Sequence, residues 1–131
     1  MSEIYNLNSN TLLSGTSGND YLQNMEGNNV TINAGEGNDS VYNDASNVSI
    51  FGGNGNDSIK TGAPEDSSNL NAYIDGGEGN DRIYNYGSDY AVIVGNLGDD
   101  YIDNWGENVL FKYKEGDGND IIQGFNETST L

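Results

Sequence analysis

Apolar and polar residues alternate in short segments that recur along the chain. Residues 30–32 (Val-Thr-Ile) and 48–50 (Val-Ser-Ile) place β-branched aliphatic residues two apart, with a polar residue between them. A period of two is typical of half-buried β-strands, and β-branched residues favour strands. No segment sustains the longer period of a helix. The pattern therefore predicts a chain of short strands and turns.

The alternating segments belong to a repeat, which is marked by an Asp at a fixed place. Gly stands two residues before this Asp in every copy, and an aliphatic residue stands two residues after it. The steps between copies are 19, 18, 24, 19 and 20 residues. The turn aspartates are Asp20, Asp39, Asp57, Asp81, Asp100 and Asp120. A fixed period of this length indicates a protein whose repeats stack on their neighbours.

Columns of apolar residues at fixed offsets from the turn Asp predict the core. Two residues after the Asp stand Leu22, Val41, Ile59, Ile83, Ile102 and Ile122. Seven residues before it stand Leu13, Ile32, Ile50, Ile74, Ile93 and Tyr113. Nine residues before it stand Thr11, Val30, Val48, Ala72, Ala91 and Phe111. Each copy holds two short strands and two turns, so we expect an all-β, right-handed parallel β-solenoid of about six coils.

We expect one solenoid domain over residues 1–131. Residues 1–10 are a half-repeat lead-in, because residues 4–6 resemble residues 83–85. Residues 62–69 contain the only proline and account for the 24-residue step as an inserted loop. The alternative is a linker between two solenoids, but the same columns continue on both sides. Residues 111–131 form the terminal repeat.

The charge of the chain limits its partners. It has 21 acidic side chains against four basic ones, a formal net charge of −17, and neither cysteine nor histidine. Disulfides, thiolate sites and imidazole ligands are therefore excluded. Such a charge opposes compaction unless cations offset it, and it argues against nucleic acids and anionic membrane surfaces. No segment has the roughly 18 consecutive apolar residues of a transmembrane helix.

Each turn combines glycine-rich backbone with one carboxylate. Glycine allows carbonyl groups to turn inward, where a side chain would clash. Carboxylate and carbonyl oxygens suit Ca²⁺, which takes six to eight oxygen ligands, whereas Mg²⁺ demands tighter octahedral geometry. Parallel strands lie about 4.8 Å apart, so the Asp of one coil comes close to the carbonyls of the next. The turns therefore predict calcium ions shared between coils.

Two segments carry a specific resemblance. GGNGNDSI at 52–59 and GGEGNDRI at 76–83 match the glycine-rich nonapeptide of repeats-in-toxin (hemolysin-type) proteins, which binds calcium. The chain resembles that family over residues 11–125, and residues 111–125 are similar to the closing repeats of such arrays. The resemblance implies a calcium-dependent β-roll whose ligands are the six turn aspartates and glycine carbonyls. The implied carbonyls are those of Gly15, Gly18, Gly35, Gly37, Gly53, Gly55, Gly77, Gly79, Gly98, Gly116 and Gly118.

Only one turn of each coil carries the motif, whereas family members often carry two. We expect a single column of about five ions, which would bring the formal charge of −17 to about −7. The opposite corner should be closed by Asn side chains bonded to the backbone. Residues 16–17 and 96–97 depart from the glycine pattern, so weaker sites are expected there. Without Ca²⁺ the chain should be largely disordered.

These features predict a calcium-binding structural or spacer module of a larger secreted or surface protein, monomeric as a fragment. The acidic residues follow the repeat instead of forming one unique site, so an enzyme is not expected. The alternatives are a glycan-binding module using outward aromatic residues, or an ice-binding module using outward rows beside the turn Asp. The aromatic residues could equally cover the sheet by stacking between coils. The row three residues before the Asp is mixed in size and charge, which disfavours ice.

Overall fold

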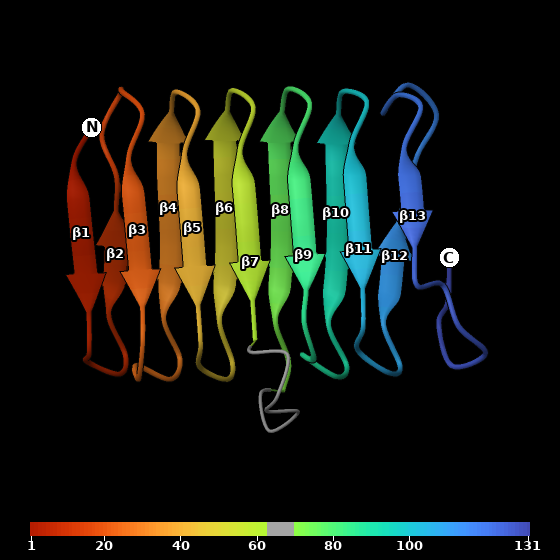
Figure 1. The fold of residues 1–131 in the computed structure, drawn as a ribbon, viewed down its shortest axis with the longest axis horizontal. Coiled ribbons are helices and arrows are strands. Elements are labelled where there is room, and N and C mark those ends of the chain that lie inside the picture. Colours follow the sequence, from red (N-terminus) through yellow and green to blue (C-terminus); the bar gives the residue numbers. More distant parts are fainter. Residues whose placement is uncertain (63–69) are drawn as a thin grey trace.

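A computed structural model describes residues 1–62 and 70–131, which form strands, turns and connections (Figure 1). No helix occurs in these residues, and thus none that could cross a membrane. The odd-numbered strands are β1 Glu3–Asn6, β3 Tyr21–Asn24, β5 Ser40–Asn43, β7 Ser58–Thr61, β9 Arg82–Asn85, β11 Tyr101–Asn104 and β13 Ile121–Gln123. The even-numbered strands are β2 Leu12–Ser14, β4 Thr31–Glu36, β6 Ser49–Asn54, β8 Tyr73–Glu78, β10 Val92–Leu97 and β12 Leu110–Lys112.

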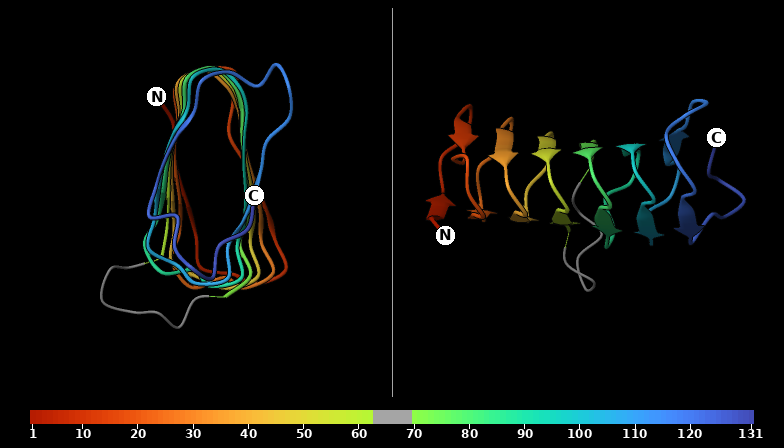
Figure 2. Two further views of the ribbon diagram at one scale, coloured as in Figure 1. Left: turned by 90° about the vertical axis from the view of Figure 1, so that its right-hand side faces the viewer. Right: turned by 90° about the horizontal axis from the view of Figure 1, so that it is seen from above.

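The strands form two parallel sheets facing each other. The odd-numbered strands make a seven-stranded sheet in the order β1-β3-β5-β7-β9-β11-β13, and the even-numbered strands make a six-stranded sheet. Each coil contributes one strand to each sheet, which gives a flattened tube when viewed along the stack (Figure 2). The expected parallel β-solenoid of about six coils is confirmed.

The predicted apolar columns line the inside of this tube. Leu22, Val41 and Ile59 are paired in register across β3, β5 and β7. Side chains along β4 to β11 alternate between buried and more exposed. Each side of the solenoid is a single sheet, so the core between the two sheets is a narrow stack of aliphatic side chains.

The prediction of Tyr113 as a core residue is wrong. Its side chain is 52% exposed, whereas Phe111 in the same coil is buried. Strand β12 ends at Lys112, and the segment after it swings out of the stack (blue in Figure 2). The Tyr113 hydroxyl donates a hydrogen bond to the Gly118 carbonyl, which holds the ring outside.

Asn side chains close the corner opposite the glycine-rich turns, as expected. Asn24 is fully buried, and its Nδ2 donates to the Gly27 carbonyl at 2.8 Å and to Oδ1 of Asn43 at 2.7 Å. Thr61 interrupts this column, and its hydroxyl accepts a hydrogen bond from Asn43. A buried amide ladder therefore satisfies the backbone at this corner.

The expected inserted loop at 62–69 lies, apart from Gly62, outside the described residues. The strands on either side of it are in register with their neighbours. Ile50 of β6 pairs with Ile74 of β8, and Ile59 of β7 pairs with Ile83 of β9. The 24-residue step thus leaves the stacking of the described coils unchanged.

Candidate calcium site

The six turn aspartates form one column along the stack. Each follows the connection from an even-numbered strand to the next odd-numbered strand, at the upper edge in Figure 1. The first five are buried, with at most 2% of their surface exposed, and Asp120 is partly exposed. Five buried carboxylates in a row are unusual, because ionised carboxylates are rarely fully buried without a partner.

One oxygen of each carboxylate bonds to the coil before it. Oδ1 of every turn Asp accepts a hydrogen bond from a backbone N–H of the preceding coil, at 2.7 to 3.0 Å. From the second Asp onward, the donor is the N–H of the preceding turn Asp. The ladder fixes the direction of each carboxylate and turns its second oxygen toward the inside of the turn.

The second oxygen has no partner in four consecutive coils. Oδ2 is buried and accepts no hydrogen bond in Asp39, Asp57, Asp81 and Asp100. Leaving a buried charged oxygen unpaired costs more than the roughly 1–3 kcal/mol of a neutral group. Four such atoms in register call for a cation, since no N–H or O–H of the described chain reaches them.

In the turns of Asp57, Asp81 and Asp100, the unpaired oxygen faces space that a glycine leaves open. A Cβ added to Gly76 would lie 2.4 Å from Oδ2 of Asp81 and 2.8 Å from the carbonyl oxygen of Gly95 in the next coil. A Cβ added to Gly52 would lie 2.5 Å from Oδ2 of Asp57 and 2.3 Å from the carbonyl oxygen of Gly76. A carboxylate oxygen and a carbonyl oxygen of the next coil thus converge at the same place.

Sequence reasoning included only Gly15 and Gly76 of the column five residues before the Asp. In the first five coils its members are Gly15, Ala34, Gly52, Gly76 and Gly95, and Glu115 follows in the last. The small size of the first five was the signal that could have identified the column. The structure adds the carbonyls of Ala34 and Gly95 to the candidate ligands.

The glycines expected as carbonyl ligands stack directly on their counterparts. Gly53 has a φ of +107°, and a Cβ there would lie 2.0 Å from the Gly35 carbonyl oxygen. Two of the expected glycines differ from this pattern. Gly18 does not adopt a left-handed φ, and a Cβ on Gly116 would meet nothing within 4 Å. The backbone of the first and last turns therefore differs from that of the middle turns.

The first turn pairs its Asp with the chain's own donors. Oδ2 of Asp20 accepts hydrogen bonds from the backbone N–H of Thr16 at 2.6 Å and from its hydroxyl at 2.7 Å. Chiefly the Thr16 hydroxyl lowers the pKa of Asp20 to about 2. Asp20 is thus fully hydrogen-bonded, unlike the aspartates of the following coils.

Burial shifts the other carboxylates in the opposite direction. It raises the pKa of Asp57 to about 6, of Asp81 to about 7 and of Asp100 to about 6. The backbone N–H that each accepts lowers the pKa, but burial outweighs it, and neighbouring carboxylates add to the rise. Burial also raises the pKa of Asp39 and Asp120. Without a counter-ion, the carboxyls of the middle turns therefore keep their protons to a higher pH than an exposed Asp does.

These shifts predict that acid stabilises the calcium-stripped fold. An unfolded Asp has a pKa of 3.8, so between pH 4 and 7 the folded chain binds more protons than the unfolded chain. The free energy of unfolding should therefore increase as the pH falls from 7 to 4. This gain should be lost when the pH is raised again. Circular dichroism of stripped protein from pH 7.5 to 5 should show increasing strand signal. An Asp81→Asn variant should show a smaller increase in strand signal. A loss of strand signal from the unmodified chain on acidification would contradict the prediction.

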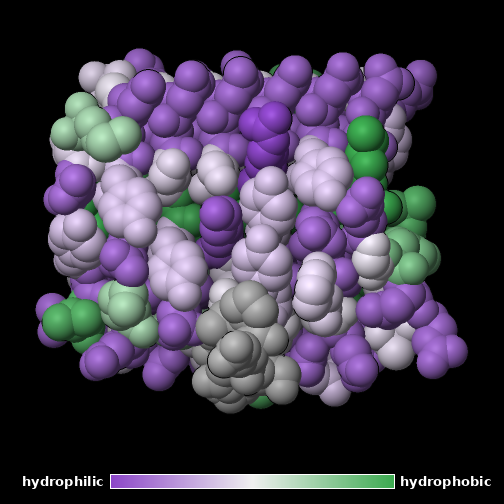
Figure 3. Space-filling view, viewed as in Figure 1, coloured by the Kyte–Doolittle hydropathy of each residue, from purple (hydrophilic) through white to green (hydrophobic). Residues whose placement is uncertain are grey.

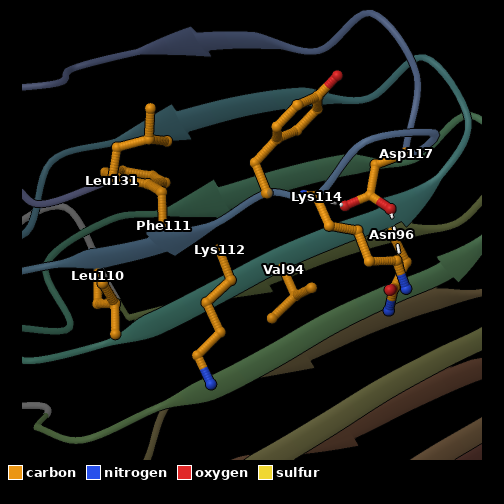
Figure 4. Close-up of a pocket in the computed structure, with 9 residues that line it drawn as sticks. Val94, Asn96, Leu110, Phe111, Lys112, Lys114, Asp117 and Leu131 are labelled. Carbon is orange, nitrogen blue, oxygen red and sulfur yellow. Dashed lines mark hydrogen bonds and ion pairs between the residues drawn. The ribbon is translucent and has the colours of Figure 1, made fainter.

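The terminal turn carries an additional buried carboxylate beside a surface cavity. Asp117 lines a cavity of about 500 Å³ between the segment after β12 and strand β10 (Figure 4). The Lys114 backbone N–H donates to its Oδ2 at 2.9 Å, and the Lys114 ammonium lies 4.0 Å from its Oδ1. The ion pair within the same turn provides Asp117 with a counter-charge, which the middle aspartates lack.

Side chains alone do not make a metal centre here. Within residues 1–62 and 70–131, no group of three His, Cys, Asp or Glu side chains could hold a metal ion. A site in this column would combine carboxylates of neighbouring coils with backbone carbonyls. Such an all-oxygen donor set fits Ca²⁺ better than Mg²⁺ or transition metals.

Comparison with known proteins agrees with this donor chemistry. The family model of the RTX calcium-binding nonapeptide repeat (4 copies) matches residues 14–50, 35–63 and 71–88. These segments contain the turns of Asp20, Asp39, Asp57 and Asp81. No curated protein and no solved structure is significantly similar to the chain.

Proposed function

Because the chain belongs to the RTX calcium-binding nonapeptide repeat family, we propose that it is a module that folds on binding Ca²⁺ and then serves as a rigid spacer or scaffold in a larger protein. Calcium binding by the repeats is the property shared by the family. The spacer role, the location outside the cell and the ligand assignment are proposals. They are supported by the stack of turns and by the charge of the chain.

The four unpaired Oδ2 atoms are the observation that carries this proposal. Asp39, Asp57, Asp81 and Asp100 would hold the ions, together with the glycine-rich carbonyls of the same and the next coil. Asp20 and Asp120 complete the column at its two ends, where Thr16 already satisfies Asp20. Bound calcium would supply positive charge to the buried carboxylates and cross-link neighbouring coils.

A single column of about five ions is the arrangement that the two corners favour. The corner opposite the Asp column is filled by amide side chains that satisfy one another and the backbone, as with Asn85 and Asn104. No carboxylate lies in that buried amide column. We therefore place all ions along the glycine-rich edge of one solenoid domain.

A rigid spacer outside the cell follows from coupled folding and binding. Extracellular Ca²⁺ is plentiful, so the module would remain unfolded before export and become a rod afterwards. Small-angle X-ray scattering of the chain without and with Ca²⁺ tests this idea. The radius of gyration should fall sharply on addition of Ca²⁺, and the folded particle should be elongated along the stack.

Replacing one middle carboxylate should remove calcium binding at its level of the stack. Asp81→Asn keeps the shape and the Oδ1 acceptor but loses the charge, so titration calorimetry should give at least one ion fewer per chain and weaker binding at the neighbouring level. Glu78→Gln removes one charge from the same turn at an exposed position and should retain the full stoichiometry. Equal ion counts for Asp81→Asn and the unmodified chain would exclude Asp81 as a ligand.

A further inference from the structure

Four aromatic side chains form a cluster on the outer face of the seven-stranded sheet. The ring centroids of Tyr84 and Tyr86 are 5.8 Å apart with nearly parallel planes, and those of Tyr84 and Tyr101 are 6.1 Å apart. Trp105 meets Tyr86 edge to face at 6.1 Å. Figure 3 shows pale, ring-shaped side chains gathered on this face of the molecule. We call these four residues the aromatic cluster.

A carboxylate lies at the centre of the aromatic cluster. Asp103 pairs in register with Tyr84, and Tyr101 and Trp105 stand two residues before and after it on the same side of β11. Its Oδ1 accepts a hydrogen bond from the Trp105 indole at 3.2 Å. Asp103 thus has three aromatic residues as neighbours, on a chain whose net charge is −17.

The chain already places one ammonium group against this cluster. Lys60 pairs in register with Tyr84 from the β7 side, and its Nζ lies over the Tyr84 ring at 5.6 Å from the centroid. Tyr86 stacks nearly parallel to Tyr84, so the ammonium group of Lys60 lies against a stacked pair of rings. The cluster thus combines aromatic surface with the nearby negative charge of Asp103, as cation-binding aromatic sites do.

We propose that the aromatic cluster and Asp103 bind the quaternary ammonium group of a small organic cation. A quaternary ammonium has no N–H donor, so it loses no hydrogen bond when rings replace its hydration water. Its charge is attracted by the ring faces and balanced by the Asp103 carboxylate.

A sugar fits this surface less well, because two of its hydrogen-bond donors already have acceptors and the surface carries a negative charge. The Tyr101 hydroxyl donates to Gln123 at 2.8 Å, and the Trp105 indole donates to Asp103. The stacked rings and the negative charge of Asp103 are the main features of this surface. They favour an organic cation over a neutral polyhydroxyl ligand.

Trp105 is the only tryptophan, so its fluorescence reports on this site alone. The full chain in saturating Ca²⁺ is titrated with choline, with its uncharged carbon isostere dimethylbutanol, and with KCl at matched ionic strength. A saturable change with choline only is expected. Absence of saturation, an equal response to dimethylbutanol, or a response confined to neutral oligosaccharides overturns the proposal. Phosphatidylcholine vesicles at equal headgroup concentration then separate the sources: a stronger response assigns a lipid headgroup, and an equal or weaker one a soluble cation.

Variants with opposite expected effects distinguish binding from structural damage. Tyr86→Leu and Asp103→Asn should each weaken choline binding by roughly two- to fivefold, the range of a solvent-exposed cation–π contact. Tyr42 lies in β5, on the same outer face of the seven-stranded sheet but outside the cluster. Tyr42→Leu should therefore leave choline binding unchanged. Lys60→Met removes the competing ammonium and should tighten binding. Tightening cannot arise from local unfolding, so unchanged or weaker binding by Lys60→Met contradicts the assignment even if the other variants fold poorly.

Discussion

Removal of calcium is expected to convert the chain from a strand-rich fold to a largely disordered one. The middle turns bury four carboxylate oxygens that receive no donor from the described chain. The charge of −17 adds repulsion between coils, and the core is only a narrow stack of aliphatic side chains. In the proposed assignment, bound calcium would make the same carboxylates cross-links between coils. Folding and calcium binding should therefore occur together.

Far-ultraviolet circular dichroism in excess chelator, followed by addition of Ca²⁺, measures this transition. The strand signal should disappear with chelator and return cooperatively with Ca²⁺. Mg²⁺ at the same concentration should restore much less, because it keeps its waters and requires octahedral geometry. An unchanged strand signal in excess chelator would contradict coupled folding.

A salt control separates specific binding from simple screening. Sodium chloride screens repulsion between exposed charges, with a screening length of about 8 Å at physiological ionic strength. It does not supply a partner to the buried oxygen of Asp57 or Asp81. Salt alone should therefore restore little strand signal, whereas a full recovery would show that net charge, and not the turn sites, controls folding.

The solenoid could be predicted from the sequence because its signals repeat. Six copies of Gly-x-Asp-x-aliphatic fix the period, and the alternation of residues 30–32 and 48–50 fixes the strands. The Asn corner could be predicted for the same reason. Because the same pattern occurs in every coil, each copy supports the interpretation of the others. A mistaken assignment in one copy therefore does not change the predicted fold.

Departures within single coils could not be predicted, because they depend on local backbone geometry. Asn96 replaces a glycine, yet it adopts a left-handed φ of 72°, which Asn tolerates better than other non-glycine residues. Thr16 at the same position in the first coil does not, and it bonds Asp20 instead. The swing of Tyr113 out of the core depends on how the stack ends. No column in the sequence encodes that.

Replacing Gly55 by Ala is expected to raise the calcium concentration needed for folding strongly, whereas Gly18→Ala should be tolerated. Both glycines stand two residues before a turn Asp. Gly55 has a φ of +129°, and a Cβ there would lie 1.9 Å from the Gly37 carbonyl oxygen. Left-handed strain of about 1–2 kcal/mol and overpacking of about 1–3 kcal/mol should add, because the contact is with rigid backbone. Gly18 avoids the left-handed region, and its nearest atom would be 4.0 Å away.

The calcium concentration at the midpoint of folding, measured by circular dichroism, compares these two variants directly. For Gly18→Ala, the free energy of folding derived from this midpoint should stay within about 0.5 kcal/mol of that of the unmodified chain, as is usual for surface substitutions. Gly116→Ala separates the two causes, because Gly116 has a φ of +97° but a Cβ there would meet nothing within 4 Å. It should show the strain without the clash and fall between the other two. Equal losses for Gly55→Ala and Gly18→Ala would mean that the motif position, and not the close stacking of the middle turns, sets the requirement for glycine.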